Sequence, residues 1–235
     1  MPSFDHSPWS RRSTSIVLLA AAVCLMTATA RQAAAQFPDD ATVLALEFDG
    51  PSGIIRPDPV LVAAIDAELA LIRSQHPVLA EIHVFPAWMP GELLVRMTDE
   101  ALAALEAGTF TGFDALFAEY PVANLHIFSV IPWVHITFVE ALHAPNLVPL
   151  FLAVDGVTYA EPSFVVGDGS DITLHELGSY TFKYGWGDCM SGCINNHYWE
   201  IRIEDGIAII VQEWGDDLPV RVEGVSWSQV RDLYR

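Results

Sequence analysis

The chain has 235 residues, of which 52% are hydrophobic, and a formal net charge of −19 with only 11 basic side chains. A chain this acidic lacks the basic face that nucleic acid or an anionic membrane surface requires, so both are excluded as partners. The apolar content is sufficient for a packed core and excludes an intrinsically disordered protein.

The N-terminal stretch is typical of a secretory signal peptide. Arg11 and Arg12 form a positive region, and an apolar run follows at Ile16–Met26, too short for a membrane span. We expect cleavage after Ala35, with Ala30 as the alternative, so that residues 1–35 are removed and the protein is secreted or periplasmic. The remaining chain then carries 8 basic and 29 acidic side chains, a net charge of −21.

Two other leader types share features with this stretch. Cys24 is a possible lipidation site, although Val23 is a poor residue directly before it. Ser10–Arg12 resembles a twin-arginine signal, but Thr14 and Ser15 replace the bulky apolar pair of that motif. Both remain alternatives to the ordinary signal peptide.

Residues 36–89 form an N-terminal segment for which the sequence predicts one amphipathic helix. Asp39–Gly53 is acidic and turn-rich around one short apolar alternation, Val43–Phe48. Asp58 begins the helix, whose apolar residues fall mostly on one face, and Pro77 ends it.

Residues 90–166 show a β-α-β-β-α-β order after a turn at Pro90-Gly91. The predicted elements are a strand at Leu93–Met97, a helix at Asp99–Ala107 capped by Thr98 with a second helical piece at Phe113–Tyr120, strands at Leu125–Val130 and Val134–Val139, a helix at Leu142–Val154 and a strand at Val157–Val166. This order predicts a four-stranded antiparallel sheet with its helices on one face, the ferredoxin-like arrangement.

Two segments of this unit carry a family resemblance. Pro90–Thr98 (PGELLVRMT) and Leu150–Phe164 (LFLAVDGVTYAEPSF) resemble the propeptide and peptidase-inhibitor family that accompanies subtilisin-type proteases. Within the second segment, Val154–Pro162 matches the family's closing helix and strand in order. The resemblance covers about 75 residues and implies a ferredoxin-like fold.

The resemblance also implies a partner and a binding mode. In that family the sheet face packs on the protease, and the segment after the last strand enters the protease cleft. Here that segment is Ser163–Gly167. The candidate binding residues are therefore Glu161, Pro162, Ser163 and Phe164.

Residues 167–235 are predicted to form an antiparallel β-unit behind a hinge at Gly167–Asp171. The expected strands are Ile172–Glu176, Tyr180–Tyr184, His197–Ile203 and Ile207–Trp214. Asp205-Gly206 is a turn type that favours hairpins. Ser226 is expected to cap a terminal helical turn over Trp227–Tyr234.

Cys189 and Cys193 remain as the cysteines of the cleaved chain, and an even count in an exported protein predicts one disulfide. A redox pair or a metal pair is the alternative, but the spacing is C-x₃-C and no thioredoxin-like context surrounds it. The string Gly185–Trp199 resembles a motif that recurs in uncharacterised secreted bacterial proteins. That motif has no assigned function.

Aromatic residues gather around this disulfide. Trp186, His197, Tyr198 and Trp199 are expected to cluster beside Asp188. An exposed cluster containing Trp186, Tyr198 and Trp199 can stack a sugar or a peptide side chain. The competing interpretation places these rings in the core.

The sequence offers no catalytic set. Ser191, with His197 and Asp188, lies in neither a nucleophile elbow nor a chymotrypsin-type serine motif, and we expect no triad there. The prediction is a protein that is not an enzyme.

Metal sites and cofactors are not expected either. His126 and His135 lie on adjacent predicted strands at different distances from the hinge, so they should not face each other. His175 and His197 supply at most two further imidazoles. Asp168–Asp171 lacks the ligand spacing of a calcium loop and is expected to be an acidic turn.

We therefore predict a secreted α+β protein with a ferredoxin-like unit followed by a disulfide-bonded β-unit. Its expected function is non-catalytic binding, in its most concrete form as an inhibitor-like partner of a subtilisin-type serine protease. The alternative is an extracellular module that binds glycan or peptide through the aromatic cluster. A hydrolase is the third and weakest alternative.

Overall fold

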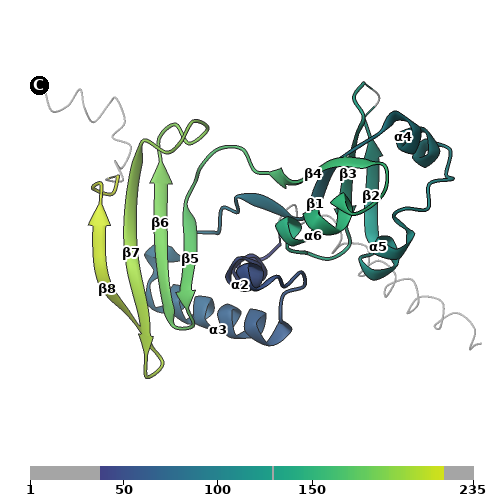
Figure 1. The fold of residues 1–235 in the computed structure, drawn as a ribbon. Coiled ribbons are helices and arrows are strands. Elements are labelled where there is room, and N and C mark those ends of the chain that lie inside the picture. The colour runs from purple at the N-terminus through teal and green to yellow at the C-terminus, as the bar shows by residue number, and fades with distance from the viewer. Residues whose placement is uncertain (1–37, 129, 220–235) are drawn as a thin grey trace, which may run out of the picture. The chain divides into compact units, whose positions relative to one another are not determined.

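The computed structural model describes residues 38–128 and 130–219 and shows a mixed α/β protein with two four-stranded antiparallel sheets and one disulfide. The first sheet has the strand order β2-β3-β1-β4, and the second has the order β5-β6-β7-β8 (Figure 1). The predicted signal peptide and the predicted helix over Trp227–Tyr234 lie outside the described residues.

The strands follow the predicted order, with ends that shift by a few residues. They are β1 (Trp88–Met97), β2 (Val122–Ile127), β3 (Trp133–Phe138), β4 (Val157–Phe164), β5 (Asp171–Glu176), β6 (Ser179–Trp186), β7 (Asn195–Glu204) and β8 (Ile207–Gly215). Asp205 and Gly206 both have positive φ between β7 and β8, as a hairpin turn of the expected type requires.

The N-terminal region contains two α-helices where the sequence predicts one. They are α2 (Asp40–Asp49) and α3 (Pro59–Gln75), each followed by a short 3-10 turn, η1 (Gly50–Ser52) and η2 (Pro77–Leu79). The interpretation of Val43–Phe48 as an apolar alternation is wrong. Helix α2 buries a nearly continuous run of residues, so it shows no 3.6-residue stripe; these residues are Ala41, Val43, Leu44, Ala45 and Leu46.

Helices α3 and α4 (Asp99–Glu106) begin at capping residues that can be recognised in the sequence. Asp58 accepts a hydrogen bond from the Val60 amide at 2.9 Å and starts α3, and Thr98 accepts one from the Ala101 amide at 3.2 Å and starts α4. Both predicted starts are confirmed. The first sheet is accompanied by α4 (Asp99–Glu106), α5 (Asp114–Glu119) and α6 (Ala144–Leu152).

Pro90 and Gly91 do not form the predicted turn before the strand; they lie inside β1. Gly91 has φ +72°, a conformation that favours glycine, and its amide donates to the Leu142 carbonyl at 2.8 Å. The pairing of β1 with β4 shifts register between Trp88 and Leu93. The glycine therefore produces an irregularity within a longer strand and does not end it.

The first sheet buries one face against its three helices. Leu93 and Val95 of β1 and Ile136 of β3 share a core with Phe113, which precedes α5, and with Phe151 of α6. Successive residues of a strand point to opposite faces. Beyond the irregularity at Gly91, the side chains of Glu92, Leu94 and Arg96 therefore lie on the other face of this sheet.

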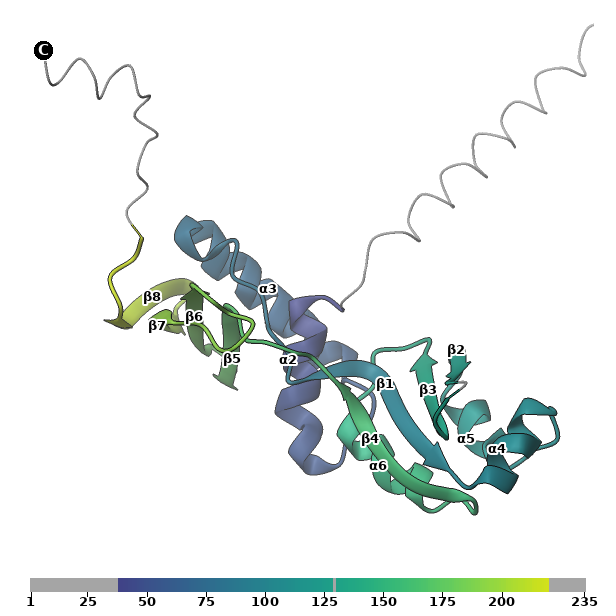
Figure 2. The same cartoon turned by 90° about the horizontal axis from the view of Figure 1, so that it is seen from above.

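Helices α2 and α3 cover one face of the second sheet (Figure 2). Leu44 of α2 and Leu69 of α3 share a core with Tyr180, Trp199 and Ile201 of β6 and β7. The N-terminal helices and the C-terminal strands thus form one hydrophobic core, although more than 80 residues separate them in the sequence.

The Tyr180 hydroxyl joins this core to α3. It donates to Glu68 at 2.6 Å, and the Gly178 amide donates to the same carboxylate oxygen at 2.9 Å. Burial and the bond to Glu68 raise the pKa of Tyr180. We expect Tyr180→Phe to lower the free energy of unfolding, measured by urea titration, by about 1–3 kcal/mol, because a partly buried carboxylate loses a donor.

Tyr159→Phe is the matched control for that measurement. The Tyr159 hydroxyl also donates to a glutamate, Glu161, at 2.9 Å, but the residue is 46% exposed. We expect its replacement to change stability by less than about 0.5 kcal/mol in the same urea titration. Equal losses in the two variants would contradict the assignment of Tyr180 as a buried tie.

Candidate functional site

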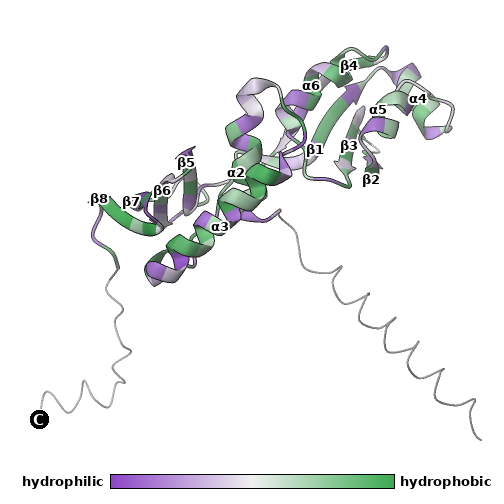
Figure 3. Cartoon of the chain, turned by 90° about the horizontal axis from the view of Figure 1, so that it is seen from below, coloured by the Kyte–Doolittle hydropathy of each residue, from purple (hydrophilic) through white to green (hydrophobic). Residues whose placement is uncertain are grey.

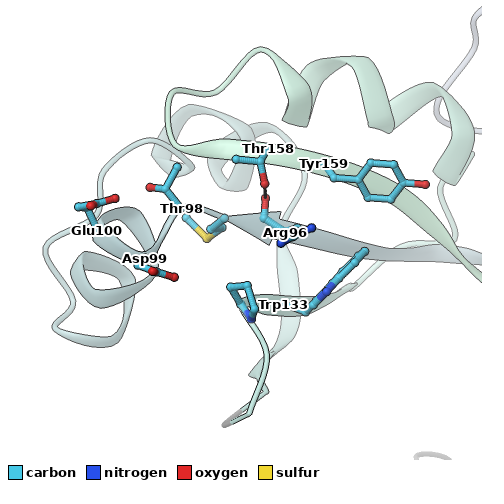
Figure 4. Close-up of a pocket in the computed structure, with 9 residues that line it drawn as sticks. Arg96, Thr98, Asp99, Glu100, Trp133, Thr158 and Tyr159 are labelled. Atoms are coloured by element: carbon cyan, nitrogen blue, oxygen red, sulfur yellow. Dashed lines mark hydrogen bonds between the residues drawn. The ribbon is translucent and has the colours of Figure 1, made fainter.

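The face of the first sheet opposite its helices carries a hollow of about 760 Å³. Arg96 of β1 is the cross-strand partner of both Trp133 of β3 and Tyr159 of β4, so these three side chains lie on one face. Figure 4 shows them together with Asp99 and Glu100, which belong to the first turn of α4. None of these residues carries a sequence signal that marks it as part of a binding site.

Two hydrogen bonds fix the walls of the hollow. The rings of Trp133 and Tyr159 meet edge to face with centroids 5.7 Å apart, and the Tyr159 hydroxyl donates to Glu161. This bond to Glu161 raises the pKa of the Tyr159 phenol. The Thr158 hydroxyl donates to the Arg96 carbonyl at 3.2 Å and links β4 to β1.

His126 and His135 lie directly opposite each other in the β2–β3 pair, so the prediction that they do not face each other is wrong. The Phe128 amide donates to the Trp133 carbonyl at 3.0 Å, which places the turn between these two residues and moves its centre toward residue 130. The His135 ring contacts the Glu92 carboxylate at 2.9 Å. Within residues 38–128 and 130–219, no group of three His, Cys, Asp or Glu is arranged to hold a metal ion.

The predicted binding residues Glu161, Pro162, Ser163 and Phe164 lie in the second half of β4. Phe164 pairs with Trp88 at the end of the strand, and its side chain is 60% exposed. Val166, two residues further on, is 76% exposed. Apolar side chains on this extended segment therefore face solvent.

Asp168 ties the end of this segment to the disulfide loop. Its amide donates to the Cys189 carbonyl at 2.8 Å, and its carboxylate accepts from the Cys193 amide at 3.3 Å and from Lys183 at 2.5 Å. The hydrogen bond from Lys183 lowers the pKa of Asp168. We refer to Ser163–Gly167 as the linker. Its first two residues belong to the end of β4, and the hydrogen bonds of Asp168 hold its other end.

The predicted disulfide between Cys189 and Cys193 is confirmed. The loop that this disulfide closes is hydrogen-bonded to Asp168 at the end of the linker, which agrees with a structural role for the bond. The neighbouring carboxylates are engaged by protein donors: Asp171, for example, accepts from the Phe85 and Ile172 amides at 2.9 and 2.8 Å. This agrees with the interpretation of Asp168–Asp171 as an acidic turn.

The aromatic residues near the disulfide do not form one surface. Trp199 is 2% exposed in the core of the second sheet, and Trp186 stacks on Tyr184 with centroids 5.4 Å apart. Tyr198 points to the opposite face, where it stacks on Trp214 at 5.2 Å with ring planes 8° apart. The proposed set of Trp186, Tyr198 and Trp199 is therefore divided, because adjacent residues of a strand alternate between faces.

The outer face of the second sheet is instead apolar along its edge strand. Ile207, Ile209 and Val211 of β8 are each at least 40% exposed, and Figure 3 shows the hydrophobic character of this strand. Trp214 is a further exposed aromatic residue on this face. Strict alternation along β8 would place it on the face of the buried Ala208, but the register shift between Glu200 and Ile201 brings it to the face of Tyr198, so no sequence signal marks its exposure.

His197 has a structural role. One ring nitrogen contacts the Asp216 carbonyl at 2.7 Å, and the other contacts the Glu213 carboxylate at 2.9 Å. Because both nitrogens are occupied, His197 is not arranged as a base for Ser191. The expectation that these residues form no triad is consistent with this geometry.

Glu47 of α2 and Asp171 of β5 form an acidic pair beside the core that α2 and α3 share with the second sheet. Burial, together with the charge of Asp171, raises the pKa of Glu47 to about 7. Burial also raises the pKa of Asp171. Ionisation of Glu47 in the folded protein therefore costs stability.

Comparisons with protein-family models, with curated proteins and with solved structures find no match for this chain. Within the described residues, no helix combines the length and the apolar character needed to cross a bilayer.

Proposed function

We propose that the protein is a non-catalytic binding protein whose partner is a serine protease of the subtilisin type. The observation that carries this proposal is the exposed linker that begins at the end of β4, with Phe164 60% and Val166 76% exposed. Two apolar side chains at alternate positions on an extended backbone suit a cleft that binds peptides as an added strand.

The topology of the first sheet supports the same proposal. The order β2-β3-β1-β4, with every pair antiparallel, is the one expected of a ferredoxin-like unit. Its helices contribute to a single core on one face, which leaves the other face free for a partner. This is the arrangement that the resemblance of Pro90–Thr98 and Leu150–Phe164 implies.

The linker differs from the binding segment of that family in one respect. It continues into β5 and is fastened at Asp168 to the disulfide loop. Fixing both ends reduces the conformational entropy that an extended segment loses on binding. The proposed mode is therefore a tethered loop presented to the protease cleft.

An exported location belongs to this proposal. A disulfide such as Cys189–Cys193 persists in oxidising compartments, where secreted proteases also act. The predicted signal peptide points to the same location.

The test is a titration of a subtilisin-type protease with the purified protein, using a chromogenic peptide substrate. We expect inhibition at about micromolar concentration. The double substitution Phe164→Ala with Val166→Ala should weaken it at least about tenfold, since two buried apolar contacts are lost. Val60→Ala, at a position 74% exposed on α3, is the matched control and should leave inhibition unchanged.

Two results would count against the proposal. The first is full protease activity at micromolar protein, and the second is inhibition that persists undiminished in the double variant. Mass spectrometry of the mixture distinguishes an inhibitor, which remains intact, from a substrate that is cut within Ser163–Gly167.

A further inference from the structure

The hollow beside Arg96 lies at the other end of β4 from the proposed protease-binding linker. Met97 pairs with Val157 at the start of β4, whereas Phe164 at its end pairs with Trp88. The eight residues of the strand separate the two ends by about 25 Å. The contacts proposed for Phe164 and Val166 therefore do not reach the hollow, which lies at the far end of the open sheet face.

Arg96 differs from the other described basic residues in its charge environment. Arg56, Arg73, Lys183 and Arg202 each form an ion pair with a carboxylate. Among residues 38–128 and 130–219, Arg96 is the one Lys or Arg side chain without such a pair. In a chain with 30 acidic side chains, an exposed guanidinium without a carboxylate partner is available to an anionic ligand.

Aromatic rings border the guanidinium on one side. Figure 4 shows the Trp133 and Tyr159 rings on the side toward which the Arg96 side chain extends. Their edge-to-face contact presents an aromatic surface next to a cation. This combination suits a ligand that joins a flat or ring-shaped apolar face to a carboxylate.

Hydrogen-bond acceptors lie on the opposite side. Asp99 and Glu100 are exposed in the first turn of α4 and line the same hollow. Ionised carboxylates accept hydrogen bonds but do not donate them, so they suit ligand hydroxyls. They repel a doubly charged phosphate or sulfate more strongly than a singly charged carboxylate.

We propose that this hollow binds a hexuronic acid, that is, a sugar ring bearing one carboxylate. The carboxylate pairs with Arg96, the ring lies against Trp133 and Tyr159, and hydroxyls donate to Asp99 and Glu100. A neutral sugar leaves Arg96 unpaired, and an aromatic acid without hydroxyls leaves the two carboxylates unused. The hollow of about 760 Å³ is large enough for one or two sugar residues.

The test measures D-galacturonate and D-glucuronate binding to the purified protein by isothermal titration and by amide and indole NMR shifts. No protease is present, so the outcome is independent of the proposed inhibitor function. We expect saturable binding of at least one sugar acid, with a dissociation constant on the order of 1 mM, and shifts centred on Trp133. D-galactose and D-glucose should bind at least about tenfold more weakly, because they lack the charge-assisted bond.

Arg96→Gln should weaken binding of the sugar acid at least about tenfold, and Arg96→Lys should give an intermediate loss, because lysine keeps the charge but lacks the planar fork. Arg202→Gln removes a paired, exposed arginine from the second sheet and should leave the affinity unchanged. Both positions are exposed, so thermal unfolding of all three variants should match the unsubstituted protein. Absence of binding by both sugar acids, or equal affinity in Arg96→Gln, would overturn the proposal.

Discussion

Replacement of Trp199 by alanine is expected to lower the free energy of unfolding by about 3–5 kcal/mol. Trp199 is 2% exposed and lies in the core that α2 and α3 share with the second sheet. Its loss removes a large buried apolar surface and leaves a cavity that the paired strands cannot close. Urea unfolding followed by far-ultraviolet circular dichroism measures the effect.

Trp214→Ala is the control with the same chemistry on the opposite face. Trp214 is 38% exposed and stacks on Tyr198 without entering the core. We expect a loss of about 1 kcal/mol or less, most of it from the aromatic contact. A larger loss in Trp214→Ala than in Trp199→Ala would mean that the two faces of the second sheet are assigned the wrong way round.

The second large effect is a stability that decreases with rising pH because of Glu47. Its pKa is about 7 in the folded protein, above the ordinary value of 4.5. Below pH 4.5 both states hold the proton and the group has no effect. Between pH 4.5 and 7 the unfolded chain releases the proton first, which favours unfolding, and above pH 7 the loss is complete.

Glu47→Gln should remove this contribution, because the amide stays neutral. We expect the variant to exceed the unsubstituted protein by about 1–3 kcal/mol in unfolding free energy at pH 8, and to match it at pH 4. Denaturant titrations at several pH values between 4 and 8 provide the measurement. Glu81→Gln, at an exposed position, is the control. It should leave the dependence of the unfolding free energy on pH unchanged.

Asp171 contributes to the same dependence of stability on pH. Asp171 adds negative charge beside Glu47, and its own pKa is raised by burial although it accepts amide hydrogen bonds from Phe85 and Ile172. Unfolding free energies that are parallel across the pH range for Glu47→Gln and the unsubstituted protein would show that the Glu47 carboxyl is solvated in the folded state.

Local signals determined several elements of this protein. Asp58 followed by proline predicts the start of α3, Thr98 predicts the start of α4, and the structure places both helices there. The hairpin at Asp205-Gly206 and the disulfide were also predictable. Each depends on one to five neighbouring residues, whose chemistry acts at short range.

Other features depend on contacts between distant segments. Helix α2 buries residues around much of its circumference, because α3 and the second sheet both contact it, and its sequence consequently shows no stripe. Gly91 continues β1 because β4 and the Leu142 carbonyl bind the strand there. The register of His126 opposite His135 is set by a turn whose centre a sequence pattern leaves uncertain by about one residue.

The candidate sites also combine features that local sequence predicts with features that depend on contacts between distant segments. The local pattern predicts that Glu161–Phe164 lies at the end of a strand and that Trp186 and Trp199 flank the disulfide. That Trp199 faces a core, that Phe164 and Val166 face solvent, and that Arg96 meets Trp133 and Tyr159 follows from contacts between distant segments. Alternation assigns side chains to two faces, but strand pairing and helix packing decide which face is buried and which residues become neighbours across it.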